Sequence, residues 1–407
     1  MHSKQLKIII ILFLFISTVC AQDVWINKIS VDGPPKGACI GFSIYSTGYI
    51  GLGLDAEGYK RSLFAYSVFS EEWNKKESLG GAIGSGLNRG SAVAFVVNEK
   101  AYVGLGNGDN PFFRDFWEYD PLTDSWTQVA DFGGTARRQA VAFSVDSFGY
   151  VGTGQDQYGL TNDFWKYNPL TNTWDTIAEF PGTPRKQAVG FSMGDIAYVG
   201  TGDDGVFTRD FWEYNTITDT WTEKAPFPGS PRYGAVGFSI YPDAYIATGY
   251  DSTLNYKKDV WVFNYWNQTW EQKDDFPGPA RSNATAFVVN GKAYLGTGYN
   301  GNYLDDFYEF IPAVGILEIK KRVECMVYPN PSSNEFYINA PECSQKADIQ
   351  IYNSNGSVVT KHFEIEKFGA YNLKLKIKST QIPDGIYYLQ ISENEINIYY
   401  SSICIIK

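Results

Sequence analysis

The sequence predicts an all-β protein, with a six-bladed β-propeller followed by a small C-terminal β-sandwich. Two observations predict the propeller, and both recur about every 47 to 53 residues. The first is a glycine-bounded strand that ends near a tyrosine, at Tyr49, Tyr102, Tyr150, Tyr198, Tyr245 and Tyr294. The second is a lone tryptophan that closes each unit, at Trp25, Trp73, Trp126, Trp174, Trp221 and Trp270. This period is typical of a propeller with four short strands per blade and is longer than the roughly 40–45 residues of a WD40 repeat.

The third unit shows how one period becomes four strands. Residues 140–145 (Ala-Val-Ala-Phe-Ser-Val) combine small and bulky residues without a polar face, which favours an inner strand packed on both faces. The glycines of residues 149–154 bound a second strand, because they permit close backbone approach and end the pairing. Residues 163–167 and 173–177 give the third and fourth strands on either side of a turn-forming Asn-Pro-Leu-Thr-Asn segment.

The ring is expected to close through the N-terminal segment. The last unit supplies strands at residues 285–289, 293–298 and 306–310, but no tryptophan-bearing fourth strand follows them. Residues 24–27 contain Trp25 and precede the first inner strand by the appropriate interval. We therefore expect residues 22–311 to form six blades, with the N-terminal strand completing the sixth blade and leaving no free sheet edge.

These units resemble the kelch repeat, in which glycines end a strand, a tryptophan follows a tyrosine by six or seven residues, and an arginine lies between blades. The resemblance covers about residues 24–311, and the family's paired glycines are replaced here by Gly-x-Gly, as in Gly104-Leu-Gly106. The sequence is similar to the bacterial, galactose-oxidase-like branch of the family. The resemblance implies the fold and leaves the activity open.

The two ends of the chain predict export. Residues 1–21 have a basic start, an apolar run and a small-residue cleavage site, as in a secretory signal peptide. The apolar run is too short to span a membrane, so we expect no transmembrane segment. Residues 312–322 form a linker, and residues 323–407 contain short strands that fit a small sandwich.

Four motifs of the last domain occur in the order and place found in one exported family. They are Val327-Tyr-Pro-Asn-Pro331, residues 349–359 with the turn Asn355-Gly356, residues 382–389 and the terminal residues 403–407. Together they resemble the C-terminal sorting domain of type IX secretion substrates from Bacteroidetes. The resemblance implies that the type IX machinery is a partner, and that the protein is secreted or attached to the outer-membrane surface.

Charge and composition exclude several functions. The net formal charge is −11, and the acidic excess falls on the propeller, so binding of nucleic acid is not expected. Both histidines, His2 and His362, lie outside residues 22–311. Copper-radical oxidation of the galactose oxidase kind needs imidazole ligands, so it is not expected, and we predict no catalytic residue, metal or cofactor. The pairing of Cys325, Cys343 and Cys404 stays open.

Two sets of repeat positions are candidate ligand contacts at a mouth of the propeller channel. A basic residue precedes each inner strand, at Lys36, Arg89, Arg137, Arg185, Arg232 and Arg281, and its uniform charge indicates a structural role. The residue after it varies, which is typical of a recognition position, and the candidates there are Arg138, Lys186, Tyr233 and Ser282. The second set follows the strand-end glycine and contains Asp156, Asp204, Asp251 and Asn300. Its oxygens suit sugar hydroxyls or calcium, but the same residue types also form turns.

Two functions are compatible with these residues. The first is a secreted or surface-attached binding module that holds a glycan or a protein ligand at the channel mouth. The second is a carbohydrate-active kelch enzyme such as a sialic acid mutarotase, a reaction that needs only positioned acids, bases and arginine. The absence of histidine from the propeller favours the binding module.

Overall fold

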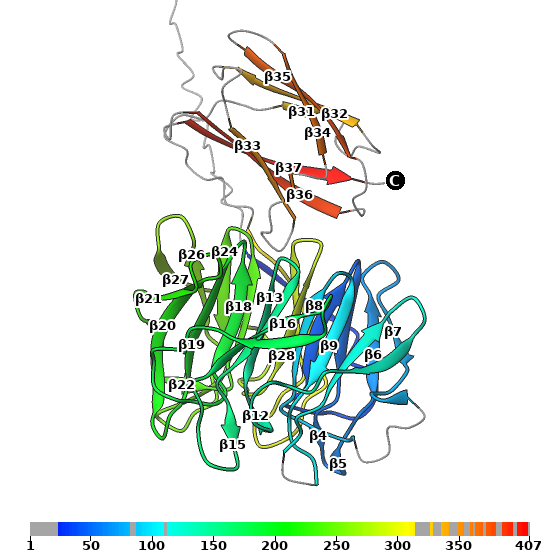
Figure 1. Cartoon of the computed structure of the whole chain (residues 1–407), viewed down its shortest axis with the longest axis vertical. Coiled ribbons are helices and arrows are strands. Elements are labelled where there is room, and N and C mark those ends of the chain that lie inside the picture. The colour runs from blue at the N-terminus through cyan, green and yellow to red at the C-terminus, as the bar shows by residue number, and fades with distance from the viewer. Residues whose placement is uncertain are drawn as a thin grey trace, which may run out of the picture.

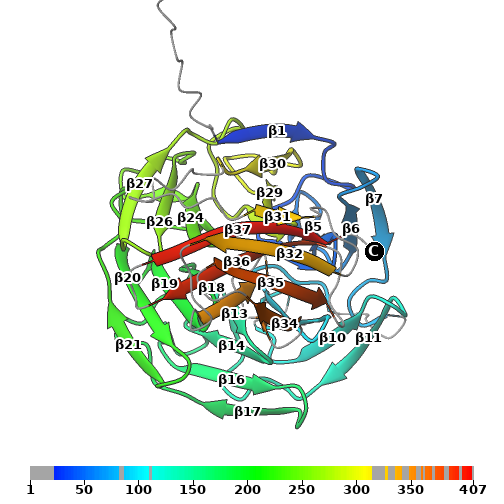
Figure 2. The ribbon, with the colours of Figure 1, turned by 90° about the horizontal axis from the view of Figure 1, so that it is seen from above.

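The computed structural model describes residues 23–81, 87–109, 112–313, 326–328, 335–341, 348–353, 359–360, 363–368, 372–379, 385–393 and 397–405. Within these residues, six four-stranded antiparallel sheets are arranged as blades around a common axis (Figure 2). The predicted all-β, six-bladed propeller is confirmed. The predicted signal peptide lies outside the described residues, as does the predicted linker from residue 314 onwards.

Five blades follow the chain from the inner to the outer strand. The first is β2 (Ile40–Ile44), β3 (Thr47–Gly51), β6 (Leu63–Ser67) and β7 (Glu72–Lys76). The second is β8 (Val93–Val97), β9 (Lys100–Gly104), β10 (Phe116–Asp120) and β11 (Ser125–Val129). The third is β13 (Val141–Val145), β14 (Phe148–Gly152), β16 (Phe164–Asn168) and β17 (Thr173–Thr176). The fourth is β18 (Val189–Met193), β19 (Ile196–Asp203), β20 (Phe207–Asn215) and β21 (Thr220–Glu223). The fifth is β23 (Val236–Ile240), β24 (Asp243–Ala247), β26 (Val260–Asn264) and β27 (Thr269–Lys273).

The sixth blade joins the two ends of the propeller sequence. Its inner three strands are β28 (Thr285–Val289), β29 (Lys292–Gly296) and β30 (Phe307–Ile311). The outer strand is β1 (Val24–Lys28), which pairs antiparallel with β30 from Val24 opposite Ile311 to Lys28 opposite Phe307. The N-terminal strand therefore completes the last blade.

The recurring aromatic residues form the core between blades. Trp221 of the fourth blade lies 5.1 Å from Phe164 of the third blade, measured between ring centroids. Its indole Nε1 donates a hydrogen bond to the Ala178 carbonyl at 3.0 Å. Trp126, Trp174 and Trp270 make the same bond to the preceding blade. These four tryptophans therefore hold neighbouring blades together by packing and by one hydrogen bond each.

The propeller has two different ends. At one end, which we call the turn face, short turns join the first to the second strand and the third to the fourth strand of each blade. At the other end, the loop face, longer loops join the second to the third strand and lead into the next inner strand. Both Val24 and Ile311 lie at the turn face, because β1 and β30 pair there.

The C-terminal part contains two antiparallel sheets on the turn-face side of the propeller (Figure 1). The first sheet is β31 (Met326–Tyr328), β32 (Glu335–Pro341), β35 (Asn372–Ser379) and β34 (Phe363–Phe368). The second is β33 (Asp348–Tyr352), β36 (Gly385–Glu393) and β37 (Asn397–Ile405). Tyr352 stacks on Tyr241 of the fifth blade with ring centroids 4.8 Å apart. The loop face points away from these sheets.

Candidate functional site

The loop face is organised by one pair of residues from each blade. In each pair, the residue before the inner strand lies opposite the residue that follows the last glycine of the second strand. The pairs are Gly37–Leu54, Gly90–Asn107, Arg138–Gln155, Lys186–Asp203, Tyr233–Tyr250 and Ser282–Tyr299. They are small or neutral in blades one and two, polar or charged in blades three and four, and rich in tyrosine in blades five and six. The chemistry of the face therefore changes around the axis.

A closed ring of backbone hydrogen bonds joins the six blades next to these pairs. Each N–H donates to the carbonyl of the equivalent residue in the neighbouring blade, at 2.8–3.1 Å. The ring consists of Ala38, Ser91, Gln139, Gln187, Gly234 and Asn283. All six have a positive φ between 52° and 60°, which is unfavourable for the five that are not glycine. The ring thus holds the mouth of the propeller in a conformation that the isolated loops would rarely adopt.

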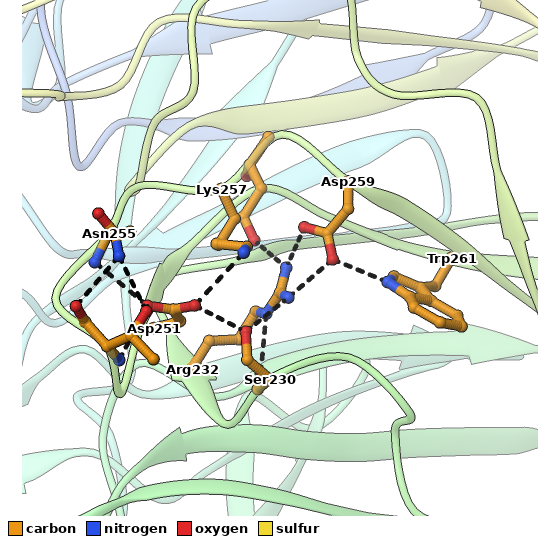
Figure 3. Close-up of polar contacts among 9 residues, drawn as sticks. Ser230, Arg232, Asp251, Asn255, Lys257, Asp259 and Trp261 are labelled. Atoms are coloured by element: carbon orange, nitrogen blue, oxygen red, sulfur yellow. Dashed lines mark hydrogen bonds and ion pairs between the residues drawn. The ribbon is translucent and has the colours of Figure 1, made fainter.

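Buried arginines stabilise the loops of the loop face through hydrogen bonds. Arg232 is fully buried, and its Nη1 and Nη2 donate to Asp259 Oδ1 and Oδ2 at 2.6 and 2.8 Å (Figure 3). Its Nη1 also donates to the Thr248 carbonyl, and Trp261 Nε1 donates to Asp259 Oδ2. The same two-bond clamp joins Arg89 to Asp115, Arg137 to Asp163, Arg185 to Asp210 and Arg281 to Asp306. The repeated basic residue therefore has a structural role in these five blades.

Blade one lacks this clamp. Lys36 occupies the arginine position and is buried, and Ser62 occupies the aspartate position immediately before the third strand. The Lys36 ammonium lies 4.5 Å from the centroid of the Phe64 ring and 3.5 Å from the Asp32 carbonyl. Burial lowers the pKa of Lys36 despite nearby acidic groups. Blade one thus lacks the arginine–aspartate pair that stabilises the loops of the other five blades.

The second set of candidate residues is used mainly in turns. Asp251 is 1% exposed; its Oδ1 accepts hydrogen bonds from the Thr253 and Asn255 N–H groups, and its Oδ2 accepts one from Ser230 Oγ (Figure 3). Burial opposes ionisation of Asp251, but the hydrogen bonds from Thr253 and Ser230 outweigh it and lower the pKa of the carboxyl.

The other members of this set form similar turns. Asp156 Oδ1 accepts from the Tyr158 and Gly159 N–H groups, and Asp204 Oδ1 accepts from the Val206 N–H. Asn300 Oδ1 accepts from the Asn302 N–H at 3.3 Å. These contacts to backbone two residues further on are typical of Asx turns and support the turn role over a ligand role.

The basic members of the variable set lie on the loop face in half-exposed positions. Arg138 donates from Nη2 to Gln155 Oε1 at 3.0 Å, and its guanidinium lies 5.5 Å from the Phe112 ring centroid. Lys186 Nζ lies 3.5 Å from Asp203 Oδ2. Neither cation is held by a short, buried ion pair, so each can exchange its present contact for a ligand group. Ser282, in contrast, is 3% exposed and is covered by its neighbours.

Aromatic side chains continue from the basic residues as an arc over blades four to six. The arc consists of Phe207, Tyr233, Tyr250, Tyr256, Tyr299 and Tyr303, all of them half-buried. The centroid distances between successive rings are 4.8, 5.7, 4.9, 6.3 and 5.1 Å. We call this set the aromatic arc. Tyr233 contacts Phe207 and Tyr250 directly, and the sequence analysis selected none of the other five residues of the arc.

The hydroxyl groups of the arc have no hydrogen-bond partner among the described residues. Elsewhere in the propeller, tyrosine hydroxyls are often engaged, as in Tyr102 with Glu118 and Tyr214 with Asp219. Burial raises the pKa of Tyr233, Tyr256 and Tyr303. The three hydroxyls therefore stay protonated at neutral pH and can both donate and accept hydrogen bonds to a ligand.

The arc escaped the sequence analysis because its members do not share one repeat position. Tyr250 and Tyr299 follow the strand-end glycine, Tyr256 and Tyr303 lie further along the same loops, and Phe207 begins a third strand. A signal was present in the density of tyrosine in the loops of blades five and six. A comparison of one equivalent repeat position at a time does not reveal that signal, because the tyrosines fall at several different positions.

No group of three or more His, Cys, Asp or Glu side chains in the described part of the chain lies close enough together to hold a metal ion. No helix among the residues that the structure describes has the length and apolar character needed to cross a membrane.

Comparisons with known proteins support both parts of the architecture. Residues 44–232 match the family model described as the KLHDC2/KLHL20/DRC7 Kelch-repeats domain. Residues 326–406 match the secretion system C-terminal sorting domain. The solved structure titled "Structure of YjhT" is 17% identical with a TM-score of 0.59, and the match covers 69% of this chain and 95% of that one. No curated protein matches the chain. At this identity, the structural match supports the fold alone.

Proposed function

The chain is a kelch-repeat propeller protein with a secretion sorting domain, and from this architecture we propose that it is an exported module that binds a glycan through its loop face. The sorting domain belongs to the type IX secretion system, which accounts for export and makes the secretion machinery a partner of the C-terminal domain. The predicted signal peptide fits the first step of this route. The mature protein would then be released or retained at the outer-membrane surface.

The observation that carries the ligand proposal is the aromatic arc with its unpartnered hydroxyls, next to Arg138 and Lys186. Sugars present apolar C–H faces together with many hydroxyl groups, and tyrosine matches both with a flat ring and one polar end. Tyrosine also provides a large contact area at low cost in side-chain entropy. The two cations add a contact for a carboxylate or other acidic substituent on the sugar.

A glycan-array screen of the purified protein tests this function. The array should carry neutral and acidic sugars, including sialylated ones. We expect saturable binding that weakens when Arg138→Ala or Lys186→Ala removes one cation, with Arg209→Ala as the matched control at an exposed basic residue of blade four. Turnover of the bound sugar would instead favour a carbohydrate-active kelch enzyme such as a sialic acid mutarotase. A blank array with folded protein would contradict the proposal and favour a protein ligand.

A further inference from the structure

We infer that the aromatic arc is an extended surface for the interior of a linear glycan, rather than a pocket for one terminal sugar. This inference rests on the proposed function and narrows the ligand to a polymer. It assigns separate parts of the ligand to separate blades. Neutral sugars lie on the tyrosines of blades five and six, and an acidic sugar lies at the end formed by Lys186 and Arg138.

The first argument is the continuity of the arc. Phe207 of blade four contacts Tyr233 of blade five at 4.8 Å, and Tyr256 of blade five contacts Tyr299 of blade six at 6.3 Å. These two contacts bridge the blade boundaries, so the rings form one uninterrupted row. A single sugar ring is about the size of one aromatic side chain, and it would leave most of this row uncovered.

The second argument is the state of the hydroxyl groups. The arc has five tyrosines, and none of their hydroxyls has a hydrogen-bond partner among the described residues. A ligand that buries these rings without satisfying the hydroxyls would be penalised, because an unpaired buried polar group is costly. A chain of sugars can offer a hydroxyl to each phenol in turn.

The third argument is the distribution of charge along the row. Lys257 directly follows Tyr256 of the arc, and its Nζ lies 3.4 Å from the buried Asp251. Its charge is therefore already matched. In blades three and four, Arg138 contacts the neutral Gln155, and Lys186 lies 3.5 Å from Asp203, whose side chain is more exposed than that of Asp251. An acidic group is thus favoured at one end of the row.

The length dependence of binding tests this inference on the full protein. Oligomers of polygalacturonate, xylan and β-glucan, from single sugars to long chains, serve as probes on one array. We expect affinity to rise with chain length for at least one series. Tyr256→Ala and Tyr303→Ala should each weaken binding of the long oligomers about tenfold, the loss typical of a residue that contributes strongly to an interface. Tyr256→Phe should show a smaller loss, because it keeps the ring and removes the hydroxyl.

Tyr158→Ala is the matched control, because Tyr158 lies on an exposed loop of blade three outside the arc. Thermal unfolding of each variant shows whether the fold is retained. Equal affinity for single sugars and long oligomers, together with unchanged binding by the arc variants, would overturn the inference. If Arg138→Ala still abolished that binding, the proposed function would stand. Absence of any glycan binding by the folded protein would overturn both.

Discussion

Removal of one carboxylate from an arginine–aspartate clamp tests whether these clamps stabilise the loop face. Asp259 is the best target because Figure 3 shows it between Arg232 and Trp261, with both partners bonded to it. Asp259→Ala leaves the fully buried Arg232 guanidinium without its counter-ion. It also leaves Trp261 Nε1 without its acceptor.

The magnitude follows from the burial of the two partners. Loss of one partner of a buried ion pair costs about 3–5 kcal/mol. The Arg232 side chain is 0% exposed and the Asp259 side chain is 14% exposed, so some water reaches the pair and the lower end of that range applies. A lost hydrogen bond from Trp261 adds about 1 kcal/mol. We therefore expect the free energy of unfolding to fall by roughly 3–4 kcal/mol.

Urea unfolding followed by tryptophan fluorescence measures this loss. The matched control is Asp275→Ala, because Asp275 forms a surface pair with Lys258 at 3.5 Å in which both side chains are about half exposed. That change should cost less than about 1 kcal/mol. The double variant Arg232→Met with Asp259→Leu should be more stable than Asp259→Ala, since it leaves no unpaired charge. If Asp259→Ala cost no more than the surface control, the clamp would not brace the loops and the reasoning would be refuted.

Three further predictions concern blade one and the acidic side chains. Lys36→Arg combined with Ser62→Asp should unfold at a higher urea concentration than Lys36→Arg alone, because it supplies the missing carboxylate; equal midpoints would contradict this account of blade one. Burial raises the pKa of Asp243 to about 6, so its contribution to stability is lost as pH rises through that value. Asp243→Asn should therefore be more stable than the wild type above pH 6, and the gain should vanish below about pH 4; a gain at all pH values would point to another cause. The Arg137 clamp lowers the pKa of Asp163 against the effect of burial, so its contribution is present above about pH 4 and is lost in acid. Unfolding measured across pH should show a smaller acid loss for Asp163→Asn than for the wild type, and identical acid losses would exclude this role.

The sequence predicted the blades because their core depends on side-chain size at fixed spacing. The tryptophans recur at the same position of each unit, and Trp174, Trp221 and Trp270 each bond the equivalent carbonyl of the preceding blade, so the period is visible in the sequence. The structural role of the basic residue before each inner strand was also visible, since its charge repeats in every blade. The predicted strand limits in blade three differ from the observed ones by one or two residues.

The ring of backbone hydrogen bonds could not be predicted in the same way. Backbone N–H and C=O groups are present at every position, and the ring residues share a positive φ without sharing a side chain. Only Gly234 and Asn283 belong to types that favour this conformation. The arc was missed for a related reason, because ring contacts such as that between Phe207 and Tyr233 depend on the loop path and not on repeat position.

The joining of both propeller ends at the turn face has a practical consequence. Val24 lies opposite Ile311, and the Ala313 N–H donates to Asp23 Oδ1 at 2.5 Å. An anchor or affinity tag placed at either end is therefore fixed to the same side of the disc. The protein can be coupled to a sensor surface or a bead through either terminus while the opposite side stays oriented towards the solution. The same geometry would let a cell display the disc with its loops outermost.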